Sequence, residues 1–389
     1  MQPAFDESTV TAGTGRWRRF SSALSLLMLG ILAAFCLDGL IFRIGPYPKF
    51  LEPDSAAGEF ELILQREKEA QAQYGDNLVA TLGDSRLGYY PRVSAQISGR
   101  TGIMLRNAGM AGTNARVWYY MMRDLDPTAR RYRAVVIGIS DYDDEDGYFD
   151  DADNLADLHY LIARLRLSDI PEFAASYRTA AARFEVFRGA LFKGLTYQTD
   201  LLQFLSHPRK RIDYVKLARS GYPVWTWDYV DSKRNLVGLQ IDWATLKVTD
   251  PPDADAVQRD SVRSFLAHPA VRQTGNLAAY RREWYGKIID RYRGSRTKII
   301  FIRLPRGAIP RPANLVHKLS SSVRELASRP NVIIDDEHAF ESLEHPELFK
   351  DGLHLNDEGD TRFSILMSEE VSRLLIQAGA LRKPRPDGL

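Results

Sequence analysis

Three side chains of the kinds that carry acyl transfer lie in two short segments near opposite ends of the chain. Ser85 follows Gly83 and Asp84, and Asp351 and His354 lie three residues apart. A serine hydroxyl is a poor nucleophile unless a base takes its proton, and a histidine base needs a carboxylate that fixes its tautomer. One turn of backbone can present Asp351 and His354 together. These residues therefore predict a serine nucleophile, a histidine base and an orienting aspartate.

The segment before Ser85 predicts where that serine lies. Residues 77–82 read as a short buried strand that ends at Gly83. A serine between a strand and a helix lies at the carboxyl edge of a sheet, where open α/β folds bind ligands. The first turn of that helix also offers free N–H groups to a developing oxyanion. The alternative is that Asp84 and Ser85 only cap the helix.

Further strands alternate with helices along the chain. The expected strands after the first are residues 133–141, 297–305 and 331–335, and the expected helices are residues 58–74, 114–123 and 357–377. A loop with two glycines, residues 106–114, leads into the second helix. Strands that alternate with helices predict an α/β fold with a parallel sheet covered by helices on both faces.

Four short blocks of the sequence, in this order, resemble those of the SGNH (GDSL-type) hydrolase superfamily. They are Gly83-Asp84-Ser85, Gly112, Gly138-Ile139-Ser140-Asp141 and the segment from Asp351 to His354. The resemblance covers residues 77–144 and 297–377 and implies a flavodoxin-like, three-layer fold. It also implies that Ser85 is the nucleophile, His354 the base and Asp351 its orienter.

The same resemblance implies an oxyanion hole made by the backbone N–H groups of Ser85 and Gly112 and by one side chain of the third block. The family has asparagine at that position, whereas this chain has Ser140. A hydroxyl donates a single hydrogen bond and rotates more freely than an amide. Because the loss of one oxyanion donor costs about 3 kcal/mol of transition-state stabilisation, we expect Ser140 to affect catalytic strength and not the fold.

Other polar residues near the blocks are candidates for substrate binding, namely Arg86, Asp84 and Asn114. Arg86 either binds an anionic group of the substrate or pairs with a carboxylate. The acidic stretch 141–153 fails the EF-hand pattern because Tyr142 falls at the first ligand position, so we expect a solvated loop. The sequence has no zinc-helix motif, P-loop or dinucleotide-binding fingerprint, and we expect no metal and no cofactor.

Residues 20–42 form a run that is apolar apart from its serines and Asp38. This run is long enough to cross a hydrocarbon core of about 30 Å, and Arg16, Arg18 and Arg19 before it predict a cytoplasmic amino terminus. A cleaved signal peptide is the alternative, but no small-x-small cleavage site follows the run. We therefore expect a single-pass anchor in a bacterial inner membrane, with the catalytic domain in the periplasm or outside the cell.

The chain as a whole has the composition of an ordinary globular protein. Its 389 residues are 44% hydrophobic and 26% charged, and the net charge of +2 is too small to indicate a nucleic-acid partner. The single cysteine lies in the apolar run, so the outer part can form no disulfide.

The expected organisation follows from these segments. In order, it comprises a cytoplasmic tail (1–19), a transmembrane helix (20–42), a linker and lead-in helix (43–75), the first part of the SGNH domain (76–149), a mostly helical insert (150–273), the second part of that domain (274–380) and a tail (381–389). The insert follows a strand end, so we expect it on the active-site side as a lid or partner surface. Its irregular aromatic segment, residues 224–229, is expected to pack in a small core, and a platform for sugar rings is the alternative.

The serine, histidine and aspartate serve two reactions equally well. With water as the acceptor the enzyme is an esterase, and with a sugar hydroxyl it is an O-acyltransferase. The anchor favours the transferase, because tethering raises the local concentration at an envelope polymer. The layout also resembles membrane-anchored SGNH proteins that act with membrane-bound O-acyltransferases on polysaccharides, which implies the bilayer, a glycan and such an acyltransferase as partners. A non-catalytic scaffold of this fold is a further alternative, favoured by Ser140.

Overall fold

A computed structural model of the chain describes residues 8–74, 77–88, 95–144, 152–220, 231–267, 276–312 and 320–382. The chain divides into two compact units. The first unit consists of Met1–Glu52 and Ile162–Lys216, and the second of Pro53–Leu161 and Leu217–Leu389. Residues 162–216 of the expected insert therefore group with the amino-terminal helix, whereas residues 150–161 and 217–273 group with the sheet.

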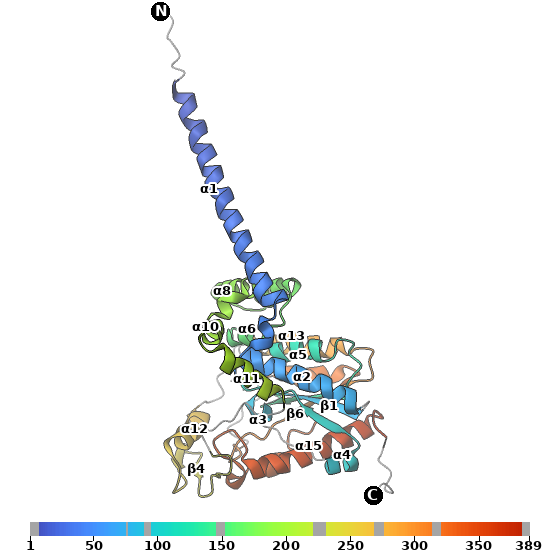
Figure 1. The fold of residues 1–389 in the computed structure, drawn as a ribbon. Helices are drawn as coiled ribbons and strands as arrows, with labels where there is room; N and C mark the ends of the chain where they lie inside the picture. The colour runs from blue at the N-terminus through green and yellow to red at the C-terminus, as the bar shows by residue number, and fades with distance from the viewer. Residues whose placement is uncertain are drawn as a thin grey trace, which may run out of the picture. The chain divides into compact units, whose positions relative to one another are not determined.

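The second unit is built on a parallel sheet of five strands in the order β2-β1-β3-β6-β7 (Figure 1). The strands are β1 (Leu78–Leu82), β2 (Met104–Asn107), β3 (Ala134–Ile139), β6 (Lys298–Arg303) and β7 (Val332–Ile334). Every residue of β1 and β3 is buried, as the apolar runs predict for central strands covered on both faces. The predicted α/β fold with a parallel sheet flanked by helices is confirmed.

Helices cover both faces of this sheet (Figure 1). One layer contains α2 (Ala56–Tyr74), α5 (Ala115–Leu125) and α13 (Asn276–Arg291), and the other contains α4 (Ala95–Thr101) and α15 (Asp357–Gln377). The last helix has the predicted limits. Its N-cap Asn356 accepts a hydrogen bond from the Gly359 N–H at 2.9 Å, and its apolar residues, spaced by three or four, join the core under the sheet.

The parallel register brings the sequence blocks to one edge of the sheet. β1 pairs with β3, and β3 pairs with β6, so that their carboxyl ends lie side by side. Ser85 follows β1 and Ser140 follows β3. The loop that carries Asp351 and His354 precedes α15. Residues from distant parts of the sequence therefore meet where ligands bind in open α/β folds.

The second half of the expected insert is not wholly helical. It contains an antiparallel hairpin of β4 (Gln240–Asp242) and β5 (Lys247–Thr249), followed by α12 (Ala256–Ala267). Leu239, before the hairpin, and Val262, in α12, belong to the core of the second unit. The expected aromatic segment, residues 224–229, lies outside the described residues.

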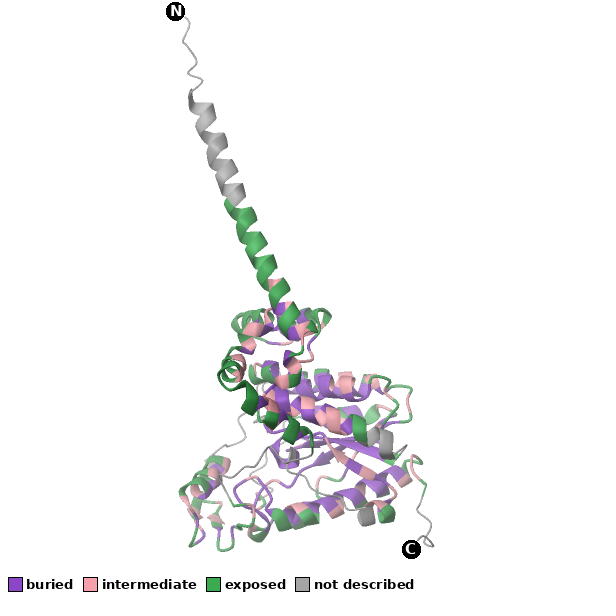
Figure 2. Ribbon diagram, in the orientation of Figure 1, coloured by how far each residue is buried: buried purple, intermediate pink, exposed green. Residues whose placement is uncertain are grey.

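The first unit joins α1 (Ser8–Gly39) to a group of short helices. They are α7 (Ile170–Ala175), α8 (Ala180–Leu191), α9 (Lys193–Thr196), α10 (Gln198–Ser206) and most of α11 (Pro208–Arg219). One segment of the described chain, Ala23–Ile44, is helical, long and apolar enough to cross a membrane. Its side chains are mostly exposed (Figure 2).

The carboxyl end of this apolar segment is held by protein and not left free. Asp38 is buried, and its two carboxylate oxygens accept hydrogen bonds from the backbone N–H groups of Lys193 and Gly194 at 3.1 and 2.7 Å. The expected span, residues 20–42, therefore ends inside the first unit. Two backbone hydrogen bonds therefore compensate for the burial of the Asp38 side chain.

Candidate active site

The structure brings Ser85, His354 and Asp351 into one hydrogen-bonded row. Nε2 of His354 lies 2.9 Å from Oγ of Ser85, and Nδ1 lies 2.8 and 3.0 Å from the two carboxylate oxygens of Asp351. All three residues are buried. In this arrangement Nε2 can accept the serine proton while Asp351 holds the other ring proton on Nδ1. The expected contacts are present, and the catalytic roles stay a prediction.

The loop that presents His354 is folded by Asp351 itself. Besides the histidine ring, Oδ1 of Asp351 accepts hydrogen bonds from the backbone N–H groups of Leu353 and His354 at 2.8 and 2.7 Å. The Lys350 N–H donates to the carbonyl of His354 at 3.0 Å and closes the loop. The spacing of three residues thus lets one carboxylate shape the turn and orient the ring.

The charge of Asp351 is maintained although the residue is buried. Burial alone would raise the pKa of Asp351, but the hydrogen bond and charge of His354, with the two backbone N–H groups, lower this pKa below its usual value. The carboxylate therefore stays ionised wherever a histidine titrates. An ionised carboxylate is what stabilises an imidazolium during proton transfer.

Leu87 packs closely against glycines and so holds the short helix that begins with Ser85 against the sheet. Ser85 begins the short helix α3 (Ser85–Gly88), and Leu87 of this helix is fully buried. A Cβ added to Gly83, Gly138 or Gly109 would lie 2.5, 2.7 or 3.0 Å from the Leu87 side chain. The glycines of two of the sequence blocks are therefore required by close packing against Leu87.

The loop that carries Gly112 is tied to the same turn. The carbonyl of Gly83 accepts a hydrogen bond from the Met110 N–H at 3.0 Å and lies 3.2 Å from the Thr113 hydroxyl. Gly112 is exposed and has φ +69°, a conformation that favours glycine. Among the described residues, neither the Ser85 N–H nor the Gly112 N–H has a hydrogen-bond acceptor. These two backbone donors are therefore available to an oxyanion.

The peptide that supplies the Gly112 N–H is held from behind by Tyr160. This residue belongs to α6 (Ala156–Leu161), and its hydroxyl donates to the carbonyl of Ala111 at 2.5 Å. The C=O and N–H of a trans peptide point in opposite directions, so this bond directs the Gly112 N–H away from Tyr160. Burial, with nearby Glu59 and Asp157, raises the pKa of Tyr160 to about 12, so its hydroxyl remains a donor. No sequence motif marks Tyr160.

Asn114, a candidate for substrate binding, is committed to the interior. Asn114 is fully buried. Its side-chain Nδ2 donates to Asp157 at 3.1 Å, and its side-chain Oδ1 accepts from the Tyr280 hydroxyl at 2.8 Å. Arg116 forms an ion pair with Asp157 at 2.9 Å, with both side chains wholly buried. Asn114 therefore offers no surface to a substrate. It joins α5 to α6, the helix that carries Tyr160.

Arg86 and Asp84 form a buried pair that reaches Ser140. Nε and Nη2 of Arg86 donate to the two carboxylate oxygens of Asp84 at 3.0 and 2.5 Å, and Nη2 also donates to Oγ of Ser140 at 2.8 Å. Of the two roles expected for Arg86, pairing with a carboxylate is present. Because Oγ of Ser140 accepts from Arg86, its own hydroxyl hydrogen points elsewhere and can be donated.

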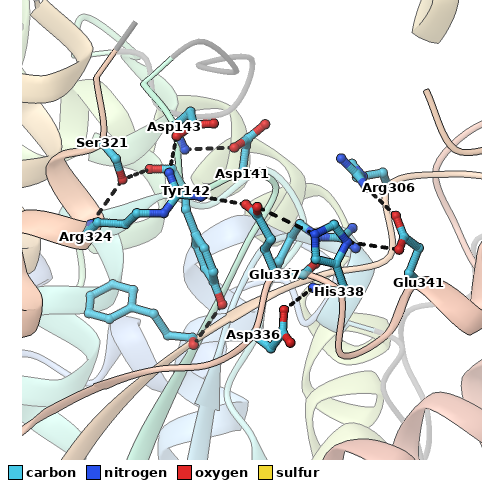
Figure 3. A network of polar contacts seen from close by, with 12 residues as sticks. Asp141, Tyr142, Asp143, Arg306, Ser321, Arg324, Asp336, Glu337, His338 and Glu341 are labelled. Carbon is cyan, nitrogen blue, oxygen red and sulfur yellow. Dashed lines mark hydrogen bonds and ion pairs between the residues drawn. The ribbon is translucent and has the colours of Figure 1, made fainter. Parts of the chain in front are cut away.

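The first part of the acidic stretch is not a solvated loop, and that expectation is wrong for Asp143 and Asp144. Both are buried. Asp143 pairs with Arg324, which also bonds Glu337 at 2.6 Å (Figure 3). Asp144 accepts hydrogen bonds from the hydroxyls of Ser320 and Ser322 at 2.7 and 2.6 Å. These contacts fix the backbone that follows Ser140, and residues 145–151 lie outside the described part of the chain.

His338 is the histidine drawn in that network, and it takes no part in the row with Ser85. Its side chain is more than half exposed, and Nδ1 lies 2.9 Å from a carboxylate oxygen of Glu341 (Figure 3). Within the described residues, no group of three or more histidine, cysteine, aspartate or glutamate side chains is placed to hold a metal ion.

No protein-family model matches the chain, and no curated protein matches it with a significant score. The candidate site joins a serine hydroxyl, a histidine with its carboxylate, two backbone donors and a hydroxyl donor at one edge of a parallel sheet.

Proposed function

We propose that this chain is a membrane-anchored serine acyl-transfer enzyme of the SGNH type, and that it transfers an acyl group to a hydroxyl of an extracytoplasmic polysaccharide. The contact of His354 with Ser85 on one side and Asp351 on the other is the observation that carries the proposal. A scaffold would have no need for a buried carboxylate that keeps its charge next to that ring.

The reaction follows from the same contacts. Oγ of Ser85 attacks the carbonyl carbon of an acyl donor while Nε2 of His354 takes the hydroxyl proton. The oxyanion that forms accepts hydrogen bonds from the N–H groups of Ser85 and Gly112 and from the Ser140 hydroxyl. The tetrahedral intermediate releases the donor alcohol, which leaves with the proton from His354 and gives an acyl-serine. A sugar hydroxyl, deprotonated by His354, then attacks the acyl carbon and restores Ser85.

The anchor supports a polymer as the acceptor. We propose that residues 23–44 cross a bacterial inner membrane and that the basic residues before them keep the amino terminus in the cytoplasm. An enzyme fixed to the outer surface meets an exported polymer at high local concentration. The acyl group would reach it from a membrane-bound O-acyltransferase, which we propose as the partner.

Transfer is distinguished from hydrolysis by the fate of the acyl group. We expect the full chain in detergent to hydrolyse a p-nitrophenyl acyl ester slowly. An added oligosaccharide should speed p-nitrophenol release and appear in the mass spectrum with one acyl group added, because its hydroxyl competes with water for the acyl-serine. A Ser85→Ala variant serves as the control. Fast release with no acylated sugar, across several acceptors, identifies an esterase, and no release with no acyl-serine identifies a scaffold.

Tyr160→Phe should lower kcat for the model ester by up to about 10²-fold, because the peptide that carries one oxyanion donor loses its restraint. KM should change little, since the ground-state ester does not need that donor. Steady-state kinetics on this variant and on Tyr119→Phe, a half-buried tyrosine of α5, provide the comparison. A rise in KM with kcat unchanged would place Tyr160 in substrate binding and not in the orientation of Gly112.

A further inference from the structure

Helix α8 of the first unit is apolar on two opposite sides. Ala182, Val186, Gly189 and Ala190 face the interior of the unit. Phe184 and Phe187 are 63% and 44% exposed, although aromatic side chains of this size are usually buried. At 3.6 residues per turn these two phenylalanines lie on the face opposite to the buried one. Something other than this chain's own core is therefore expected to cover them.

Arginines border this exposed face. Arg183 and Arg188 flank the two phenylalanines around the helix, and both are exposed. The pattern continues along the chain, because Leu195 of α9 and Leu202 and Leu205 of α10 are 50%, 59% and 64% exposed. Apolar and aromatic side chains with arginines at their margins are typical of helices that lie in the interface of a lipid bilayer.

The same helices are bonded to the end of the apolar segment of α1. The Arg43 guanidinium donates to the carbonyls of Ala190 and Leu191, the last residues of α8, at 2.6 and 3.0 Å. The side chain of Asp38 binds the first N–H groups of α9. Phe35 packs edge-on against Phe192 with ring centroids 6.0 Å apart. Figure 1 shows α8 beside the end of α1. The exposed face is thus continuous with the helix that would cross the bilayer.

We infer that α8, with α9 and α10, lies on the outer surface of the bilayer, with Phe184 and Phe187 inserted among the lipid acyl chains and Arg183 and Arg188 at the phosphate headgroups. The inference rests on the membrane crossing proposed for α1. The occupant is lipid, and a protein partner seated on the same face is the alternative that the experiment separates. A helix in this position would sink about 5–10 Å into the boundary between headgroups and acyl chains.

The test uses the full chain in which Cys36, the single cysteine, is replaced by alanine. Phe187→Cys and Phe184→Cys carry a nitroxide label in vesicles of phosphatidylethanolamine and phosphatidylglycerol with no other protein. Power saturation compares collisions with oxygen, which concentrates in lipid, and with a water-soluble nickel chelate. Asp213→Cys on α11, whose side chain is 78% exposed, is the matched label in water, and Leu29→Cys in α1 is the matched label in lipid.

We expect the oxygen-to-nickel collision ratio at residues 184 and 187 to exceed that at residue 213 severalfold and to approach that at residue 29. A lipid-like ratio at residue 29 with water-like ratios at 184 and 187 overturns the inference while the membrane anchor stands. A water-like ratio at residue 29 overturns the proposed anchor itself, and the inference falls with it.

Discussion

Replacing Ser85 by alanine is expected to reduce kcat for a model acyl ester by about a million-fold, because the nucleophile is lost and the base has no proton to take. The fold should be kept, since the Ser85 side chain contacts His354 and is not part of the core. Release of p-nitrophenol measures the loss. A fluorophosphonate should add its mass to the wild type and not to the variant.

Ser264→Ala provides the matched control for this variant, because Ser264 is an exposed serine of α12 in the same unit. It should keep both the activity and the phosphonate adduct. Activity of Ser85→Ala within tenfold of the wild type would show that another group carries the acyl transfer, and the proposed reaction would be wrong.

Asp351→Asn is expected to lower kcat by about 10⁴-fold with little change in KM. An asparagine keeps the shape of the side chain, but its amide can donate to Nδ1 of His354 and so place the ring proton on Nε2. A protonated Nε2 cannot accept the hydrogen of Ser85. Steady-state kinetics and the rate of phosphonate labelling should fall together, whereas Asp357→Asn, at an exposed position of the same region, should change neither.

The Asp351→Asn variant also tests how the free energy of unfolding depends on pH. Because the pKa of Asp351 is lowered on folding, its charge stabilises the folded state above the unfolded pKa of about 3.9, and this contribution is lost as pH falls through the lower, folded value. The difference in free energy of unfolding between wild type and Asp351→Asn should therefore shrink below about pH 4. Denaturant unfolding at pH 7 and pH 3 measures it. An equal difference at both pH values would show that the charge of Asp351 contributes nothing to stability.

The sequence predicted the elements whose signals are local. Strand β1 is a continuous apolar run that stops at Gly83, and α15 has both an N-cap asparagine and acidic residues in its first turn. Strand β2 was missed, because Met104–Asn107 is only four residues long, half-buried, and next to a loop with two glycines. A short edge strand has no periodicity that separates it from a loop.

Ser85, Asp351 and His354 were predictable because each lies in a recognisable sequence block. Asp351 and His354 share one loop, so their spacing revealed their contact. Tyr160 meets Ala111 across 49 positions, and nothing near Tyr160 in the sequence distinguishes it from a core aromatic. The contacts of Asp38 could not be predicted for the same reason, since its partners Lys193 and Gly194 lie 155 and 156 positions away. Hydrogen bonds between distant segments are a property of the tertiary fold.

The packing of Leu87 among Gly83, Gly109 and Gly138 has a consequence for how the chain can evolve. A Cβ at Gly83 or Gly138 would lie 2.5 or 2.7 Å from the end of the Leu87 side chain, so a larger residue at either glycine requires that this side chain move or become smaller. Homologues should therefore show correlated sizes at these positions, with alanine in place of glycine accompanied by valine or alanine in place of leucine. A side chain that is too large at these positions would displace helix α3, which carries both Leu87 and Ser85. Selection for activity would therefore limit the combined size of these side chains.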